Sequence, residues 1–149
     1  LPNPLSNTII KHLGRIHYYH QGLPFITWHI DNAPASRKRA ALSIYENFAD
    51  IGVFSKNKLH FYNTFRWSAG EDLLYYVLYV FKQLKLDVSA NEIYISGHAK
   101  SQKELRNLLE RYIKRIHFQS PPERFTYSYT FKKESAQHFT NLFRLSLCV

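Results

Sequence analysis

Ala40–Gly97 reads AALSIYENFADIGVFSKNKLHFYNTFRWSAGEDLLYYVLYVFKQLKLDVSANEIYISG. In order, the stretch has the pattern of a strand, a short turn, two further strands, an apolar helix and a last strand that ends in Ser-Gly. Strands are predicted at 41–45, 50–54 and 59–67, the last of which alternates cleanly between apolar and polar residues. We therefore expect a three-strand antiparallel meander.

The helix of this stretch is predicted at 72–84. Ser68 and Glu71 have the spacing of a capping box, in which each side chain satisfies a backbone N–H at the start of a helix. The helix is apolar nearly all round, so we expect it to be covered on several sides. A strand at 92–96 follows. This order predicts an α/β fold, with a mixed sheet and helices on its faces.

The flanking segments add further elements. Residues 1–12 and 33–39 are predicted to be loop-like, and the basic run at 37–39 is expected to be exposed. The other predicted elements are a strand at 13–18, a helix at 22–30, a helix from Ser101, strands at 115–118 and 125–131, and a helix from Ser135. The apolar positions expected to face the core are Leu105, Leu108, Leu109 and Tyr112 in the first late helix, and Phe139, Leu142, Phe143 and Leu147 in the second.

Composition is typical of one globular domain over residues 1–149, with 45% apolar and 21% charged residues. The single cysteine, Cys148, excludes an internal disulfide and predicts a cytoplasmic location. The longest apolar run, Leu73–Phe81, is far shorter than the roughly 20 residues that span a bilayer, so no membrane span is expected. A chain of this length without methionine is expected to be a piece of a longer protein.

The formal charge of +9 is compatible with an acidic partner, a nucleic acid or an anionic membrane surface. On the predicted helix from Ser101, the residues Lys103, Arg106 and Lys114 lie away from the leucine stripe and form a possible anion-binding surface. Acidic residues are interspersed on the same helix, so the alternative interpretation is an ordinary solvated face.

Catalytic and metal sites are not predicted. His17 and His20 are three residues apart, but neither a second cysteine nor a nearby carboxylate completes a zinc-binding set. Cys148 lies at the chain end without an activating neighbour, and Glu71-Asp72 is explained by a helix start. We therefore expect no metal and no cofactor.

Residues 42–97 resemble the second domain of the actin-like ATPase superfamily, which has a ribonuclease H-like fold, and most closely the actin-like proteins of type IV pilus assembly and type II secretion. More specifically, the chain resembles an uncharacterised bacterial family, domain of unknown function 3822. The segments that carry this resemblance are 61–65 (FYNTF), 71–78 (EDLLYYVL), 94–97 (YISG), 127–129 (YSY) and the ending from His138-Phe139 to Leu147-Cys148. Members of that family are longer, which implies that this chain is the C-terminal half of a two-domain protein.

The superfamily resemblance implies a phosphate-binding hairpin of the form Asp-x-Gly-x-x-Thr. Aligning the hairpin strands puts Ser43 at the Asp, Tyr45 at the Gly and Ala49 at the hydroxyl residue, so all three functional groups are missing. The superfamily also ends a later strand in Gly-Gly, where this chain has Gly97 and His98. These five positions are therefore interpreted as vestiges of a nucleotide site.

The resulting prediction is a non-enzymatic actin-like half-domain that acts as a scaffold or protein-interaction subunit. Its partner would be another protein or its own N-terminal half, and the candidate surfaces are the strand at 125–131 and the basic helix. Two alternatives remain open. One is an ATP-binding protein whose N-terminal half supplies the missing phosphate ligands, and the other is a basic nucleic-acid-binding module.

Overall fold

A mixed sheet forms the centre of the computed structural model, which describes residues 3–14, 18–97, 105–119 and 139–145. The sheet of the described residues has five strands in the order β3-β2-β1-β4-β5. Their bounds are β1 Arg39–Ile44, β2 Phe48–Ser55, β3 Lys58–Arg66, β4 Glu92–Gly97 and β5 Arg115–Phe118. β1, β2 and β3 are successively antiparallel, whereas β4 is parallel to both β1 and β5. The predicted meander and mixed sheet are confirmed.

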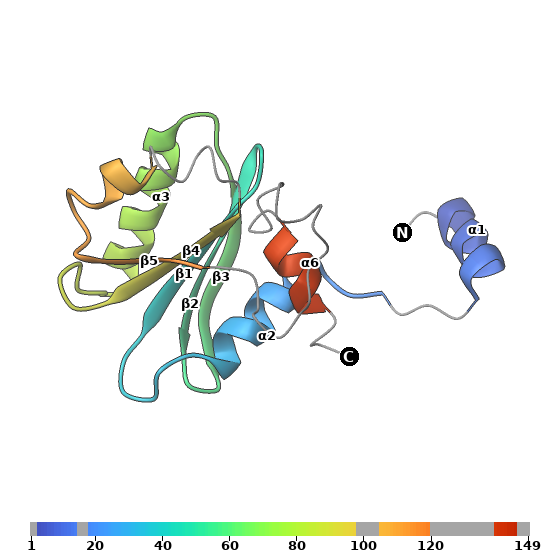
Figure 1. Cartoon of the computed structure of the whole chain (residues 1–149), viewed down its shortest axis with the longest axis horizontal. Helices are drawn as coiled ribbons and strands as arrows, with labels where there is room; N and C mark the ends of the chain where they lie inside the picture. Colours follow the sequence, from blue (N-terminus) through green and yellow to red (C-terminus); the bar gives the residue numbers. More distant parts are fainter. Residues whose placement is uncertain (1–2, 15–17, 98–104, 120–138, 146–149) are drawn as a thin grey trace, which may run out of the picture.

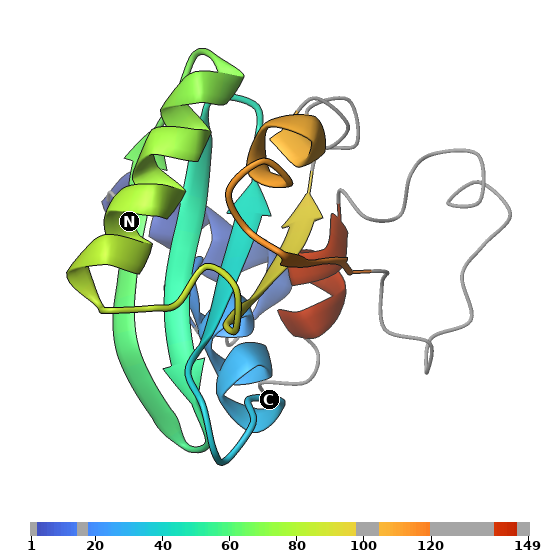
Figure 2. The same ribbon diagram turned by 90° about the vertical axis from the view of Figure 1, so that its left-hand side faces the viewer.

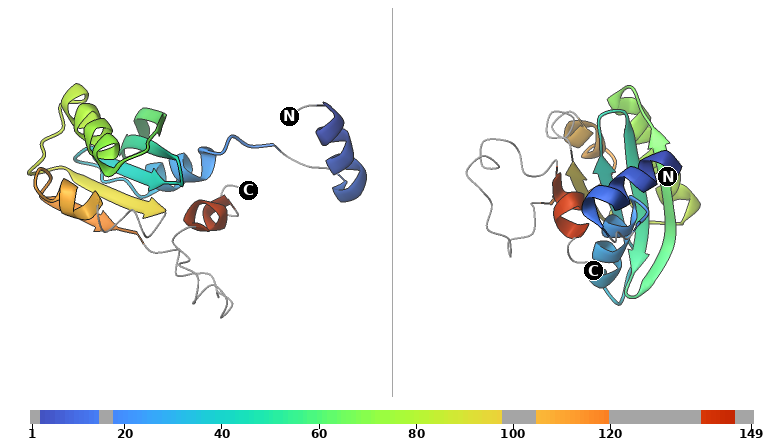
Figure 3. Two further views of the ribbon diagram at one scale, coloured as in Figure 1. Left: turned by 90° about the horizontal axis from the view of Figure 1, so that it is seen from above. Right: turned by 90° about the vertical axis from the view of Figure 1, so that its right-hand side faces the viewer.

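Helices cover both faces of this sheet (Figures 1 and 2). The helices are α1 Asn3–Leu13, α2 Leu23–Asp31, α3 Gly70–Gln83 and α6 Thr140–Leu145. Residues 105–109 are also helical. α3 and the 105–109 turns lie on one face, and α2 and α6 lie on the other, while α1 stands apart from the sheet (Figures 1 and 3).

The two faces of the sheet differ in chemistry because side chains alternate along each strand. The face toward α3 is apolar and holds the larger core, to which the strands contribute Ala40, Leu42, Ile44, Ala49, Ile51, Val53, Ile93 and Ile95. On the opposite face a small cluster of Phe25, Ala41 and Phe54 lies under α2. The rest of that face carries buried polar side chains, among them Arg39, Ser43, Asp50 and Ser96.

The N-terminal segment differs from the sequence-based prediction. Residues 3–13 form the helix α1, so the prediction of a loop over 1–12 is wrong, and Leu13 ends that helix instead of starting a strand. Leu5, Ile9 and Leu13 recur every four residues, which is the period of a helix face. Residues 15–17 of the predicted strand lie outside the described part of the chain.

The helix α3 begins differently from the predicted capping box. One carboxylate oxygen of Asp72 accepts hydrogen bonds from the backbone N–H groups of Ser68 (2.9 Å) and Ala69 (3.0 Å) and from the Ser68 hydroxyl, so Asp72 and not Glu71 caps the helix. These bonds stabilise the charged form and lower the pKa of Asp72.

The expectation that α3 is covered on several sides is wrong. One side of the helix faces solvent, because Tyr75 and Tyr79 are 64% and 46% exposed.

The helix at 105–109, β5 and α6 are of the predicted types. However, not all the residues that were predicted to face the core do so. Leu105 and Leu109 are buried, whereas Tyr112 is half-exposed and Ile113 takes its place in the core. In α6 the buried residues are Thr140 and Arg144, whereas Phe139 and Leu142 are exposed. The reason is that α6 lies on the polar face of the sheet. The predicted strand at 125–131, and Leu147, lie outside the described residues.

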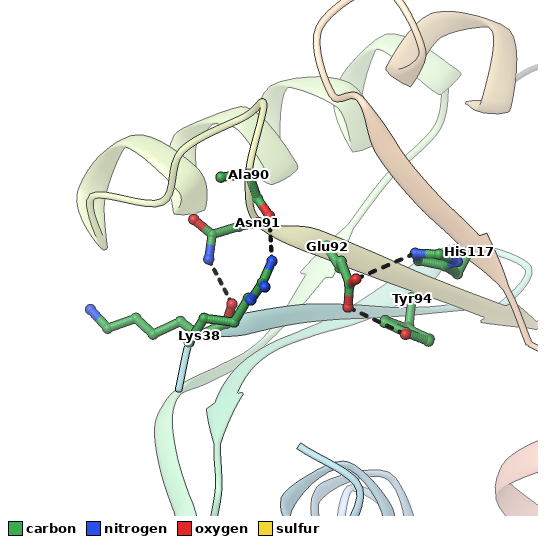
Figure 4. A network of polar contacts seen from close by, with 7 residues as sticks. Lys38, Ala90, Asn91, Glu92, Tyr94 and His117 are labelled. Atoms are coloured by element: carbon green, nitrogen blue, oxygen red, sulfur yellow. Dashed lines mark hydrogen bonds and ion pairs between the residues drawn. The ribbon is translucent and has the colours of Figure 1, made fainter. Parts of the chain in front are cut away.

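The loop at 33–38 precedes β1, and its basic residues have specific partners. The Lys38 ammonium donates to the Leu84 carbonyl (3.2 Å) at the end of α3, where a cation is favourable. Asn91 donates to the Lys38 carbonyl at 2.6 Å (Figure 4). Arg37 donates to the Ala90 carbonyl at 3.5 Å. Arg39, expected to be exposed, is the buried first residue of β1. These contacts hold the starts of β1 and β4 together.

Candidate functional site at the β1–β2 turn

The turn between β1 and β2 is the place where the resemblance to actin-like ATPases implies a phosphate-binding hairpin. The Tyr45 backbone N–H donates to the Phe48 carbonyl (2.9 Å), which closes the turn around Glu46 and Asn47. The rings of Tyr45 and Phe48 stack with their centroids 4.4 Å apart. Trp67 holds the turn from the side of β3, since its backbone N–H donates to Asn47 (3.2 Å) and its indole N–H to Phe48 (3.1 Å). Side chains therefore fill and fix this turn.

Asn141 of α6 closes the other side of the turn. Its amide donates to the Ser43 hydroxyl (3.1 Å) and to the Tyr45 hydroxyl (2.5 Å). Ser43 is 3% exposed, so its hydroxyl is used inside the protein and does not face solvent. Burial raises the pKa of Tyr45, a hydrogen bond from Ser43 opposes the shift, and the negative charge of Asp50 adds to it. Tyr45 is thus a neutral, anchored side chain.

Packing within the sheet accounts for two of the remaining vestigial positions, Ala49 and Gly97. Ala49 is fully buried in the apolar core on the α3 side. Gly97 has φ +105° and sits so close to the backbone of Ile44 that a Cβ atom would overlap it. The packing of β4 against β1 therefore explains the glycine without a ligand. His98 lies outside the described residues.

Asp50 lies in β2, inside the sheet, and is completely buried. One of its carboxylate oxygens accepts a hydrogen bond from the Thr64 hydroxyl (2.5 Å), and the other has no partner among the described residues. Burial raises the pKa of Tyr62 on the same face to about 12, with a further contribution from Asp50. Asp50 therefore belongs to a buried polar layer, and not to a metal-binding turn.

The buried polar layer also includes residues that sequence reasoning missed. Arg144 of α6 donates to Gln119 (2.9 Å) and lies over the Trp28 ring at 4.8 Å from the ring centroid. Burial lowers the pKa of Arg144 to about 10. Arg39 lies 4.3 Å from the centroid of the Tyr94 ring. No local signal in the sequence marks Asn141 and Arg144, because the short helix TNLFRL mixes polar and apolar residues.

His29 of α2 is a further fully buried titratable group on this side of the sheet. It is 0% exposed and packs between the rings of Phe25 (4.8 Å) and Phe54 (5.3 Å). Neither ring nitrogen has a hydrogen-bond partner in the described part of the chain. Burial, followed by the positive charges of Arg144 and Arg39, lowers the pKa of His29 well below its usual value. The side chain is therefore held neutral.

The predicted basic surface is only partly described. Arg106 forms an ion pair with Glu110 (2.7 Å between Nε and Oε1), in which both side chains are about half exposed. Its guanidinium also lies 5.0 Å from the Phe118 ring centroid. Lys114 is exposed, and Lys103 lies outside the described residues. Arg106 is thus paired with a carboxylate in a half-exposed ion pair of the kind that contributes little, and Lys114 lies beyond the helical residues 105–109.

Two pockets flank the turn. One, of about 470 Å³, lies between residues 18–24, Tyr45 and α6. The other, of about 390 Å³, is lined by Asn47 and by Arg66 and Asp72 on the side of β3 and α3.

Within the described ranges, no helix is long and apolar enough to cross a membrane. The same residues contain no cluster of three His, Cys, Asp or Glu side chains that would suit a metal ion.

Comparisons with known proteins agree with this architecture. The family described as Protein of unknown function (DUF3822) matches residues 1–116. A search of curated proteins finds no match. The chain is similar to the crystal structure of a Bacteroides thetaiotaomicron protein with an actin-like ATPase fold and unknown function, with 24% identity and a TM-score of 0.71 over 76% of this chain. The similarity covers 45% of that protein, so this chain spans less than half of its length. The sequence match and the shared architecture lead to one conclusion: this chain belongs to the DUF3822 family and has an actin-like ATPase fold.

Proposed function

We propose that this domain keeps an actin-like shape without phosphate chemistry and acts by binding another protein. The observation that carries the proposal is the filled β1–β2 turn, in which Tyr45 stacks on Phe48 and is hydrogen-bonded to Asn141. A phosphate cradle needs backbone N–H groups that an anion can approach. Here the Tyr45–Phe48 stack and the hydrogen bond to Asn141 fix the two ends of the turn, and the side chain of Ser43 already has a partner.

The proposed interaction with a protein is supported by the exposed aromatic side chains of α3. Tyr75 and Tyr79 are one turn apart, are largely exposed, and stack with ring centroids 6.1 Å apart. Exposed neighbouring tyrosines are enriched at protein interfaces because they offer apolar area together with a hydrogen-bonding hydroxyl. This pair is our candidate contact surface, in addition to the strand at 125–131 that the sequence suggested.

We expect no binding of magnesium ATP in the micromolar range. Isothermal titration calorimetry of this chain, and of a longer protein that contains it, should show a Kd weaker than roughly 1 mM. The Tyr45→Gly variant is the control for simple steric blocking, and we expect it not to bind either, since Ser43 and Ala49 still lack the required groups. Micromolar binding by the longer protein would overturn the proposal in favour of an ATP-binding protein completed by its other half. Binding by the Tyr45→Gly variant alone would show that the turn retains its chemistry beneath the tyrosine.

The partner that we propose first is the rest of a longer protein, because the similar Bacteroides protein is more than twice as long as the part matched by this chain. A longer protein with a protease site engineered before this domain should stay associated after cleavage and co-elute in gel filtration at micromolar concentration. The double variant Tyr75→Ser, Tyr79→Ser should weaken that association at least tenfold if α3 is the contact surface. Separation of the two cleaved pieces at micromolar concentration would exclude this partner.

A further inference from the structure

The larger pocket beside the turn has the size and chemistry of a binding site. Its volume of about 470 Å³ lies in the range of small-molecule sites, roughly 300–1,000 Å³. Three tyrosines contribute to its walls, Tyr18, Tyr19 and Tyr45, and its apolar floor includes Pro24, Leu142 and Leu145. Leu142 is 63% exposed, so part of this apolar lining faces solvent.

Among the described residues, the lining contains no Asp, Glu, Lys or Arg side chain, and its polar members besides the tyrosines are His20, Gln21 and Asn141. A charged ligand would lose hydration in this pocket without gaining an ion pair. The smaller pocket across the turn differs, because Arg66 and Asp72 line it with charges of both signs. The larger pocket therefore favours an uncharged ligand.

One side of the pocket is held in place by the turn itself. Phe48 stacks on the Tyr45 ring, and Asn141 fixes the Tyr45 hydroxyl, so this wall does not need to reorganise when a ligand enters. Pro24 is buried at the start of α2 and adds a rigid surface. Asn141 also lines the pocket and offers a polar edge next to the aromatic wall.

We propose that this pocket binds an uncharged aromatic ring, which packs against the tyrosine side chains and Leu142. Offset or edge-to-face contacts between rings stabilise such a ligand beyond simple burial of apolar area. The proposal is independent of the protein-binding role, since it depends only on the lining of the pocket. The ring belongs either to a small molecule or to an aromatic side chain of another protein.

The test is a titration of the ¹⁵N-labelled chain with indole and with p-cresol, followed by two-dimensional NMR. We expect saturable shifts confined to residues 18–24, Tyr45 and 141–145, with a Kd on the order of 1 mM for ligands of this size. Leu142→Glu places a charge on the exposed floor and should weaken binding roughly fivefold or more. Leu13→Glu changes another exposed leucine, which is 73% exposed and lies in α1, and should leave the Kd unchanged.

N-acetyl-tryptophanamide distinguishes the two sources of the ring. Binding at least as tight as that of indole indicates that the pocket accepts a residue within a peptide, whereas binding of indole alone indicates a small molecule. Shifts that do not saturate, that spread beyond the pocket, or that persist unchanged in Leu142→Glu would overturn the proposal. Calorimetry with magnesium ATP tests the separate proposal that the β1–β2 turn does not bind nucleotide. Either proposal can therefore be overturned without the other.

Discussion

Gly97→Ala should lower the free energy of unfolding by roughly 3–5 kcal/mol, a large part of the total for a domain of this size. Two effects add. An alanine is strained at φ +105°, and its Cβ would overlap the backbone of Ile44, which cannot move without breaking the pairing of β1 with β4. Urea unfolding followed by circular dichroism measures the change.

Gly14→Ala is the matched control, because Gly14 also has a positive φ (+74°) but has no atom within 4 Å of an added Cβ. There only the backbone strain remains, so the loss should be about 1 kcal/mol or less. Equal effects of the two variants would show that Gly97 is needed for its backbone angle alone. An unchanged free energy of unfolding in Gly97→Ala would show that β1 and β4 do not approach each other this closely at Gly97.

His29→Phe should stabilise the protein and reduce its sensitivity to acid. In the folded state the pKa of His29 is lowered, so the protein binds this proton less well than the unfolded chain does. Stability is therefore full above the unfolded pKa of about 6.5 and falls as the pH drops below it, by at most about 1.4 kcal/mol per pH unit for one group. A phenylalanine between Phe25 and Phe54 removes this loss. At pH 7 it also removes two buried ring nitrogens that have no partner among the described residues, a gain of about 1–2 kcal/mol.

Thermal unfolding between pH 5 and pH 8 measures both parts of this prediction. His12→Phe is the control, because His12 lies on the exposed helix α1 and its replacement adds the same ring without touching the buried layer. The stability of the wild-type protein and of His12→Phe should fall more steeply toward acid than that of His29→Phe. Parallel curves for all three proteins would mean that His29 is protonated in the folded state.

The sequence pattern predicted the central strands and turns because they depend on residues that are neighbours in the sequence. The alternation of residues 59–67 and the turn at Asn57, which has φ +57°, are properties of neighbouring residues. The candidate site was less predictable, since Asn141 contacts Ser43 and Tyr45 across 98 and 96 residues. Nothing local indicates that Arg144 turns inward while Leu142 stays outside. That choice depends on Gln119 and Trp28, which lie on other elements.

The unequal faces of the sheet have a consequence for how the strands choose their alignment. A shift of any central strand by one residue would exchange its two sets of side chains between the faces. Asp50 or Arg39 would then enter the apolar layer beneath α3, without Thr64 or Tyr94 to receive it. Burying an unpaired charge in this way costs several kcal/mol. The polar layer thereby penalises every alignment in which a central strand is shifted by one residue, and favours the observed pairing over these alternatives.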